Sequence, residues 1–272
     1  AQQSDSVKTT LSEIVVTANK TETPYYAVGS SVSIITSEDI SRQNLRTVVD
    51  LLRGMPGLTI TQQGGPGKLA YVYTRGSNSN HTLVIIDGVK MNDASSPNNA
   101  FDFSTLNTND IERIEIVRGP QSTLYGSEAI AGVINIITKR GTDKPQYNFS
   151  GEGGSNNYYR GNLSAQGKSG ILSYAITATR NGSDGISASD ARFGNTEKDR
   201  YTNNSIYSRL GFDLSSTAKL DIIYKFTKIE TALDQSERLG DDPNFNFNIE
   251  EQLFKSGLSL SLFDGRWQQQ IN

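Results

Sequence analysis

The C-terminal half of the chain repeats one pattern that strongly limits the folds open to it. After about residue 141, seven segments place apolar side chains at every second position. This period is typical of β-strands, whose successive side chains point to opposite faces of a sheet. Most segments are about ten residues long, the length that a tilted strand needs to cross a bilayer. The segments are centred on 147–149, 159–165, 172–178, 206–214, 218–226, 254–262 and 267–271.

The connections between these segments are sorted by length. They are short near 154–156, 168–169, 215–216 and 264–265, and long over 181–202 and 229–249. Short turns on one side and long loops on the other are typical of outer-membrane barrels. A soluble β-sandwich also alternates and stays open as an alternative, but it gives no reason for such sorting. The pattern therefore favours membrane-spanning strands.

Composition excludes several classes of function. The 272 residues include no cysteine, which excludes a disulfide framework, a thiolate metal site and a cysteine nucleophile. The one histidine, His81, has no serine and aspartate partners at a recognisable spacing, so we predict no enzyme activity. A net charge of −3 provides no positive field for nucleic acid. No apolar run reaches the 18 residues of a membrane-spanning helix, and no leader pattern of basic and apolar residues is present.

Residues 24–140 have a different pattern, which predicts a mixed α/β domain. We expect strands over 31–36, 111–117 and 133–138 and a helix starting at 36–39. A second helix is expected over 45–53, ended by Gly54. The sequence 83–91 carries Asp-Gly at 87–88, the signature of a type I′ hairpin. Upstream, 11–18 is a β-prone segment with no local partner.

Three groups of residues invite a functional interpretation but have ordinary alternatives. The segment 64–68 (GGPGK) lacks the remaining residues of a phosphate-binding loop, so a turn is favoured. Arg75 and Arg118 each precede glycine, and are either exposed or held by carboxylates from elsewhere. The acidic residues of 181–202 and 229–249 could bind Ca²⁺, but without EF-hand spacing the residues alone favour solvated side chains.

Seven ordered motifs closely resemble the plug domain of TonB-dependent outer-membrane receptors. They are 51–57 (LLRGMPG), 74–76 (TRG), 83–89 (LVIIDGV), 111–115 (IERIE), 117–120 (VRGP), 124–127 (LYGS) and 132–138 (GVINIIT). The resemblance implies an N-terminal extension over 1–23, an α/β plug domain over 24–140, and antiparallel transmembrane β-barrel strands over 141–272. Receptors of this family have 22 barrel strands, so we expect this chain to be an N-terminal portion with an incomplete barrel.

The resemblance also implies partners. The segment 13–18 looks like the family's TonB box, which adds as a strand to the periplasmic protein TonB. Its residues are Glu13, Ile14, Val15, Val16, Thr17 and Ala18. In the family, barrel glutamates lock the plug arginines, which correspond here to Arg75 and Arg118. These glutamates would lie beyond Asn272. The surroundings would be outer-membrane lipid.

The loops are most similar to those of cobalamin-transporting members of the family. The expected function is therefore TonB-dependent uptake of a scarce bulky nutrient, a corrinoid first, in a Gram-negative outer membrane. A ferric-siderophore or haem receptor is the alternative, and a non-transporting calcium-dependent adhesin is a further one. The resemblance implies structural Ca²⁺ at Asp184, Glu197, Asp199 and Asp234. Ligand contacts are expected at Gln62, Gly64, Lys68, Met91, Asn92 and Asn99.

Overall fold

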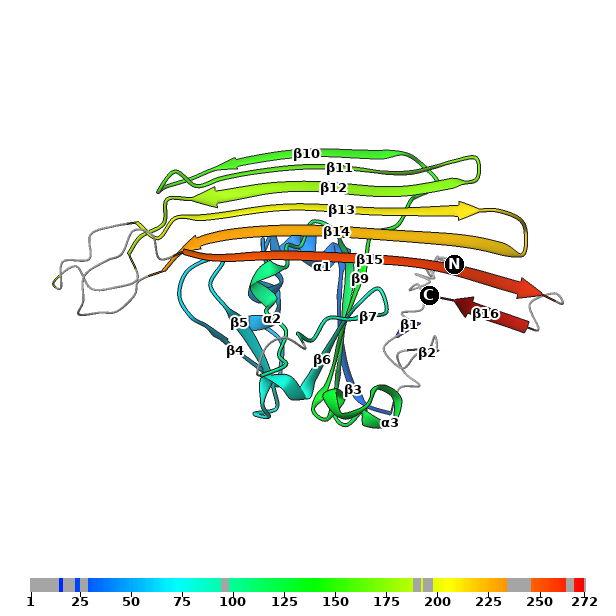
Figure 1. The fold of residues 1–272 in the computed structure, drawn as a ribbon, viewed down its shortest axis with the longest axis horizontal. Coiled ribbons are helices and arrows are strands. Elements are labelled where there is room, and N and C mark those ends of the chain that lie inside the picture. The colour runs from blue at the N-terminus through cyan, green and yellow to red at the C-terminus, as the bar shows by residue number, and fades with distance from the viewer. Residues whose placement is uncertain are drawn as a thin grey trace, which may run out of the picture.

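The computed structural model describes residues 15–16, 23–24, 29–93, 98–187, 192, 198–233, 246–262 and 267–271. A long antiparallel sheet curves over a smaller α/β domain, which packs against its concave side (Figure 1). We call this long sheet, β10 to β16, the wall.

The α/β domain is built on a five-stranded sheet in the order β3-β8-β9-β6-β7, in which only β6 and β9 run parallel. A separate hairpin pairs β4 with β5. The strands are β3 (Ser31–Thr36), β4 (Leu58–Gln62), β5 (Ala70–Thr74), β6 (Thr82–Ile86), β7 (Val89–Lys90), β8 (Ile111–Arg118) and β9 (Gly132–Thr138). The helices are α1 (Ser37–Gln43), α2 (Val48–Arg53) and α3 (Ser122–Tyr125), with 3-10 turns η2 (Ser79–His81), η3 (Phe103–Thr105) and η4 (Ser127–Ala129).

Local sequence explains where the first two helices begin. Thr36 caps α1 in a capping box with Asp39, which confirms the predicted helix start. The second helix begins at Val48, later than predicted, because Thr47 is extended and caps the helix by accepting from the Asp50 amide. Leu45 precedes the helix yet still packs against the core.

Two predicted turns have different outcomes. Asp87 and Gly88 both have positive φ, 48° and 86°, as a type I′ hairpin requires, so that prediction is confirmed. Gly54 directly follows α2, as predicted, but its φ is −82°, so it ends the helix without the left-handed backbone that glycine often adopts there. The positive φ lies at Gly57, at 72°, where the chain turns into β4.

The wall consists of seven strands, each paired antiparallel with the next along the chain. They are β10 (Gln146–Gly153), β11 (Tyr159–Ser169), β12 (Leu172–Ser183), β13 (Tyr201–Asp213), β14 (Ala218–Ala232), β15 (Asn246–Leu262) and β16 (Trp267–Ile271). The connections after β11, β13 and β15 are short and share one end. The longer ones, after β12 and β14, share the other end with the short β10–β11 connection (Figure 1). The predicted series of seven strands is confirmed.

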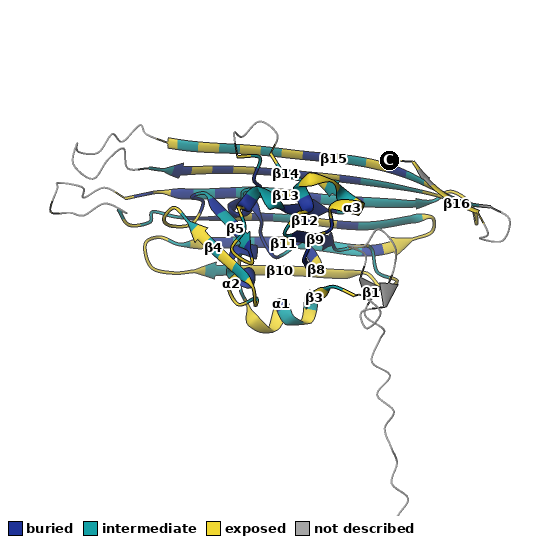
Figure 2. Ribbon diagram, turned by 90° about the horizontal axis from the view of Figure 1, so that it is seen from below, coloured by how far each residue is buried: buried dark blue, intermediate teal, exposed yellow. Residues whose placement is uncertain are grey.

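The two faces of the wall have opposite chemistry. Apolar side chains point away from the α/β domain and stay exposed, as with Phe149 at 81% and Phe254 at 69%. Polar side chains point toward it and are buried, as with Asn203 and Thr227. Buried and more exposed residues accordingly alternate along the wall strands (Figure 2). A soluble sandwich would bury its apolar face, so the sandwich alternative is rejected. The predicted fold class, an α/β domain followed by barrel strands, is confirmed.

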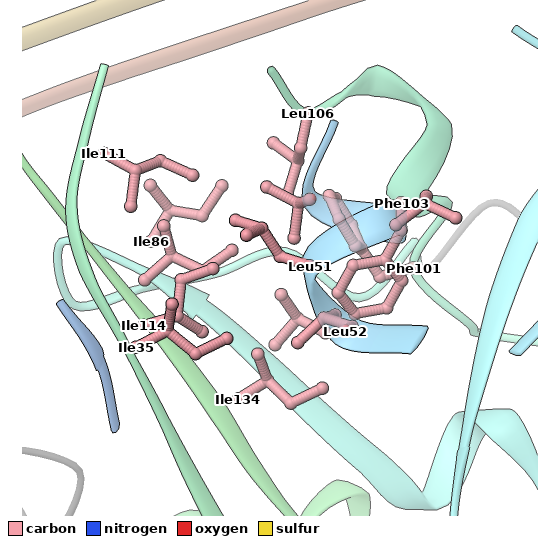
Figure 3. Packing of buried hydrophobic residues seen from close by; sticks show 14 of the residues in the cluster. Ile35, Leu51, Leu52, Ile86, Phe101, Phe103, Leu106, Ile111, Ile114 and Ile134 are labelled. Atoms are coloured by element: carbon pink, nitrogen blue, oxygen red, sulfur yellow. The ribbon is translucent and has the colours of Figure 1, made fainter. Parts of the chain in front are cut away.

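The core of the α/β domain lies between its main sheet and α2. Figure 3 shows Leu51 and Leu52 packed among sheet residues such as Ile86 and Ile114. The same cluster continues into the wall through Ala175, Tyr207, Ile223 and Leu253. The domain is therefore joined to the wall by apolar packing as well as by polar contacts. Within the described residues, no helix is long and apolar enough to span a membrane.

The N-terminal β-segment has a partner that was not predicted. Val15 and Val16 form β1, which pairs antiparallel with Thr23 and Pro24 of β2. The expectation that 11–18 has nothing local to pair with is thus wrong for its central residues. Glu13, Ile14, Thr17 and Ala18 lie outside the described residues.

Candidate ligand site and domain contacts

The loop between β4 and β5 is fastened to the wall by a buried ion pair. The Lys68 ammonium lies 2.6 Å from a carboxylate oxygen of Asp199, and the two side chains are only 5% and 7% exposed. Lys68 lies in the connection between β4 and β5, and Asp199 lies two residues before the start of β13. Breaking a buried pair leaves an uncompensated charge and costs about 3–5 kcal/mol. This contact therefore fixes where the loop lies at the long-connection end of the wall.

Glycine lets the same loop approach the wall closely. At Gly67, whose φ is +80°, an added Cβ would lie 2.3 Å from the Tyr201 ring. At Gly64, with φ +124°, it would meet the aliphatic part of Lys68 at 2.6 Å. Both positions combine a left-handed backbone with close contact, so only glycine fits without movement.

We expect Gly67→Ala to displace this loop and to weaken ligand binding by about tenfold or more. The methyl group would clash with a buried ring, and alanine at positive φ adds about 1–3 kcal/mol of strain. Gly65→Ala is the matched control, because nothing lies within 4 Å of its added Cβ and its φ is not positive. Ligand titration of the full-length receptor checks this. Equal affinities of the two variants would exclude a role for the loop position.

Two of the four predicted calcium ligands are described, and both already contact cationic side chains. Asp184 accepts a hydrogen bond from Asn157 at 2.7 Å and lies 3.4 Å from the Lys198 ammonium. The Asn157 hydrogen bond, with help from Lys198, lowers the pKa of the Asp184 carboxyl. Asp199 pairs with Lys68.

The backbone beside these two acids is in close contact. A Cβ at Gly185 would lie 2.2 Å from the Asp199 carbonyl oxygen. Glu197 and Asp234 lie outside the described residues. Among the residues that the structure does describe, no cluster of three potential metal ligands occurs. The calcium site therefore stays a prediction.

The remaining predicted ligand contacts are held in hydrogen bonds within the domain. Asn92 accepts from the Val84 amide at 2.9 Å and donates to the Thr82 and Asn99 carbonyls. Asn99 donates in turn to Glu128 at 3.3 Å. Asn92 thus closes the end of the β6–β7 hairpin. Met91 packs against the core.

Gln62 lies apart from these residues, at the end of β4 beside Lys68's loop. Its amide donates to the Gly65 carbonyl at 2.9 Å, and its oxygen accepts from Arg53. Of the six predicted ligand contacts, Gln62, Gly64 and Lys68 therefore lie together at the tip of the β4–β5 hairpin. Ligand contact by any of the six stays a prediction.

The two arginines predicted to be locked both lie near Gly57. An added Cβ at Gly57 would lie 3.4 Å from the Arg118 side chain and 3.8 Å from that of Arg75. Arg75 has a left-handed backbone, with φ at 51°, and its amide donates to the Gly57 carbonyl at 2.8 Å. Arg118 is buried. The predicted lock stays a prediction.

A second buried ion pair, which was not predicted from the sequence, joins the α/β domain to the wall. The Asp87 carboxylate lies 3.2 Å from the Arg209 guanidinium, and the side chains are 3% and 10% exposed. Arg209 also pairs with Asp221 at 2.6 Å, and Lys255 donates to the Asp87 carbonyl at 2.8 Å. Asp87 further accepts from the amide and hydroxyl of Thr138. The hairpin tip thus contacts β9 of its own domain and β13 and β15 of the wall.

Further polar contacts line the same interface. Arg46 lies 2.6 Å from Glu152, an ion pair that remains partly exposed. Asn109 accepts from Arg160 at 2.9 Å and donates to Thr179 at 3.0 Å. Such contacts give the polar groups on the inner face of the wall hydrogen-bond partners in the α/β domain. Sequence signals for them are weak, since asparagines near 107–109 read only as loop residues.

Comparison with known proteins now identifies the domain that packs on the wall. Residues 25–133 match the family described as the TonB-dependent Receptor Plug Domain. The α/β domain is therefore similar to a TonB-dependent receptor plug domain, and we call it the plug domain below. This family is one of receptors rather than of enzymes.

Solved structures of outer-membrane receptors share the plug domain and the wall together. The ferripyoverdine receptor of Pseudomonas aeruginosa matches with a TM-score of 0.73 at 18% identity over 92% of this chain. The siderophore receptor PiuA of Acinetobacter baumannii matches at 0.70, with 20% identity over 89%. The alcaligin receptor FauA of Bordetella pertussis matches at 0.71, with 17% identity over 93%.

The chain spans only part of each of these receptors, namely 34%, 35% and 40% of their lengths. An incomplete barrel agrees with the expectation of an N-terminal portion. At these identities the likeness establishes the fold, which is that of an outer-membrane receptor. It agrees with the predicted outer-membrane location, and it gives no particular support to a cobalamin-type receptor.

Proposed function

We propose that this chain is part of a receptor that imports a scarce, bulky nutrient across the outer membrane, with energy delivered through TonB. The observation that carries the proposal is the plug domain packed on the polar inner face of a membrane-type wall. A plug in that place blocks diffusion through the barrel, so passage requires the plug to move. The segment 13–18 supplies the strand that TonB would take by β-augmentation.

A ferric siderophore is the first ligand class of this proposal. Each of the three receptors described above is named for a siderophore or as a siderophore receptor. A corrinoid is the second class, supported by the resemblance of the loops at 64–68 and 181–199 to those of cobalamin transporters. Haem stays grouped with the ferric siderophores, as in the sequence analysis. A calcium-dependent adhesin without transport would give the plug domain and the β-prone 13–18 segment no role.

Ligand titration of the full-length receptor that carries this segment tests the ligand class. The probes are a hydroxamate, a catecholate and a pyoverdine-type ferric siderophore, haem, and cyanocobalamin, each with and without Ca²⁺. Tight binding of one ferric siderophore, independent of calcium, is the expected result. Binding of cyanocobalamin alone would replace the first ligand class by the second. Binding of none, with calcium-dependent attachment to cells, would favour the adhesin.

Calcium belongs with the corrinoid alternative, and we propose it only at the loops carrying Asp184, Glu197, Asp199 and Asp234. A calcium ion at Asp199 would compete with the Lys68 ammonium, which lies 2.6 Å from the carboxylate. We therefore expect Lys68→Met to tighten Ca²⁺ binding by about tenfold or more, because removing a charge-assisted partner frees a carboxylate. Calorimetric titration with Ca²⁺ measures this. No binding heat in either protein would remove calcium from the proposal.

A further inference from the structure

The outward face of the wall carries a hollow within its apolar surface. This face points away from the plug domain (Figure 1). Five apolar side chains from five successive strands form one cross-strand row there, since each is the register partner of the next. They are Phe149, Leu163, Ala178, Ile206 and Phe226. The row lines a hollow of about 360 Å³.

Small residues create the hollow. Gly161 and Ala178 lie on neighbouring strands among larger side chains, and both line it. An added Cβ at Gly161 meets nothing within 4 Å, so the space in front of this glycine is open. Phe149 and Leu163, exposed at 81% and 59%, stand beside it. The opening is large enough for a slender apolar body and too small for a protein domain.

A cation lies at the rim of the hollow that is closer to the long connections. In the next cross-strand row, Gly161 is the partner of Arg180, Arg180 of Asn204, and Asn204 of Lys228. Arg180 is exposed and, within the described part of the chain, forms no ion pair. Lys228, in contrast, lies 2.7 Å from Glu230. Arg180 is therefore the uncompensated charge of this row.

We propose that the hollow binds one acyl chain of an anionic lipid and that Arg180 holds the head group. The inference rests on the proposed function only for the membrane location. The row with Arg180 and Lys228 marks the change from apolar to polar side chains near the long-connection end, where lipid head groups lie. A guanidinium at that depth that forms no ion pair among the described residues matches an anionic head group directly above an apolar chain. The lipid is thus in the leaflet on the long-connection side.

Two variants separate the contribution of the head group from that of the chain. Arg180→Gln removes the charge and keeps a polar side chain, whereas Gly161→Leu fills the hollow. Lys228→Gln is the matched control for charge, since Lys228 lies in the same row but is paired with Glu230. Ser208→Leu is the matched control for added apolar volume. Ser208 lies two residues after Ile206 on β13, so the two side chains point to the same face of the wall. Ser208 does not line the hollow.

The test uses the full-length receptor in nanodiscs of phosphatidylglycerol and phosphatidylcholine with identical acyl chains, followed by native mass spectrometry of retained lipid. We expect the parent protein to retain phosphatidylglycerol preferentially. Arg180→Gln should reduce that preference by about tenfold, and Gly161→Leu should reduce retention of both lipids. Lys228→Gln and Ser208→Leu should behave like the parent.

Several outcomes would overturn the proposal. Equal retention of the two lipids by the parent excludes a role for the head-group charge. Unchanged retention in Gly161→Leu excludes the hollow, and a dimer mass lost in that variant identifies a second copy as the occupant. Circular dichroism of each variant verifies that the sheet is intact. Uptake is a separate readout, because failure of the parent to import any ligand would refute the proposed function and leave the lipid result standing.

Discussion

Replacing Val15 by proline is expected to abolish TonB-dependent uptake and to leave ligand affinity unchanged. Proline has no backbone N–H and cannot take part in a strand ladder at a central position. The predicted contact with TonB is an added strand over 13–18, so its energy comes mainly from main-chain hydrogen bonds. Loss of about 90% of uptake corresponds to about 1.4 kcal/mol, within reach of one or two such bonds.

The control for this variant is Val15→Thr, because threonine is also β-branched and keeps the amide donor. Uptake of radiolabelled ligand by whole cells and binding to isolated membranes are measured in parallel. Normal uptake in Val15→Pro would refute coupling through this segment. Loss of binding in both variants would instead indicate that the change disturbs the plug domain.

The β1–β2 pairing adds a condition to this coupling. Val15 and Val16 are already paired with Thr23 and Pro24, so their backbone groups on that side are occupied. A strand has two edges, and TonB could add to the free one or replace β2. A ladder of two residues is short, and isolated two-stranded pairs are only marginally stable. Replacement of β2 is therefore energetically accessible.

Local chemistry explains which elements were predicted. Period-two alternation gave seven strands, because residues on one strand face have one environment over their full length. Asp87-Gly88 predicted a type I′ turn, since few other pairs accept two positive φ values. Hydrophobic spacing alone predicted that the second helix begins at Leu45. The helix begins at Val48 because Thr47 is its N-cap. Strands β4 and β5 were not predicted, because each has only five residues and so gives a weak periodic signal.

The contacts between the plug domain and the wall could not have been predicted. Lys68 and Asp199 are 131 residues apart, and Asp87 and Arg209 are 122 apart. The sequence around each of these residues does not specify its partner, because the ion pairs depend on how the plug domain packs against the wall. The family resemblance directed attention to Arg75 and Arg118, whereas the described ion pairs use Asp87 and Lys68. Asp199 was singled out as a metal ligand, and its described partner is an ammonium.

Loss of the Asp87 charge is expected to loosen the plug domain from the wall. In Asp87→Asn the residue keeps its shape and tolerates positive φ, so the hairpin turn itself should persist. The variant loses a charge-assisted contact with Arg209 in a site where both side chains are buried. Hydrogen bonds to charged groups contribute about 1.5–3 kcal/mol. The expected loss is in this range, because Arg209 keeps its second partner, Asp221.

Hydrogen exchange of the β6 and β7 amides in the full-length receptor measures the opening free energy that this change reduces. Arg209→Met should have the larger effect, about 3–5 kcal/mol, since it leaves the buried Asp87 carboxylate without its guanidinium. The two single variants and the double variant form a cycle that isolates the coupling between the side chains. Asp213→Asn is the control for an exposed ion pair, because Asp213 and its partners Lys168 and Lys219 are 35%, 43% and 69% exposed. Exchange that stays equal in Asp87→Asn and Asp213→Asn would mean that apolar packing through Tyr207, Ile223 and Leu253 holds the plug domain, with the buried ion pair contributing nothing measurable.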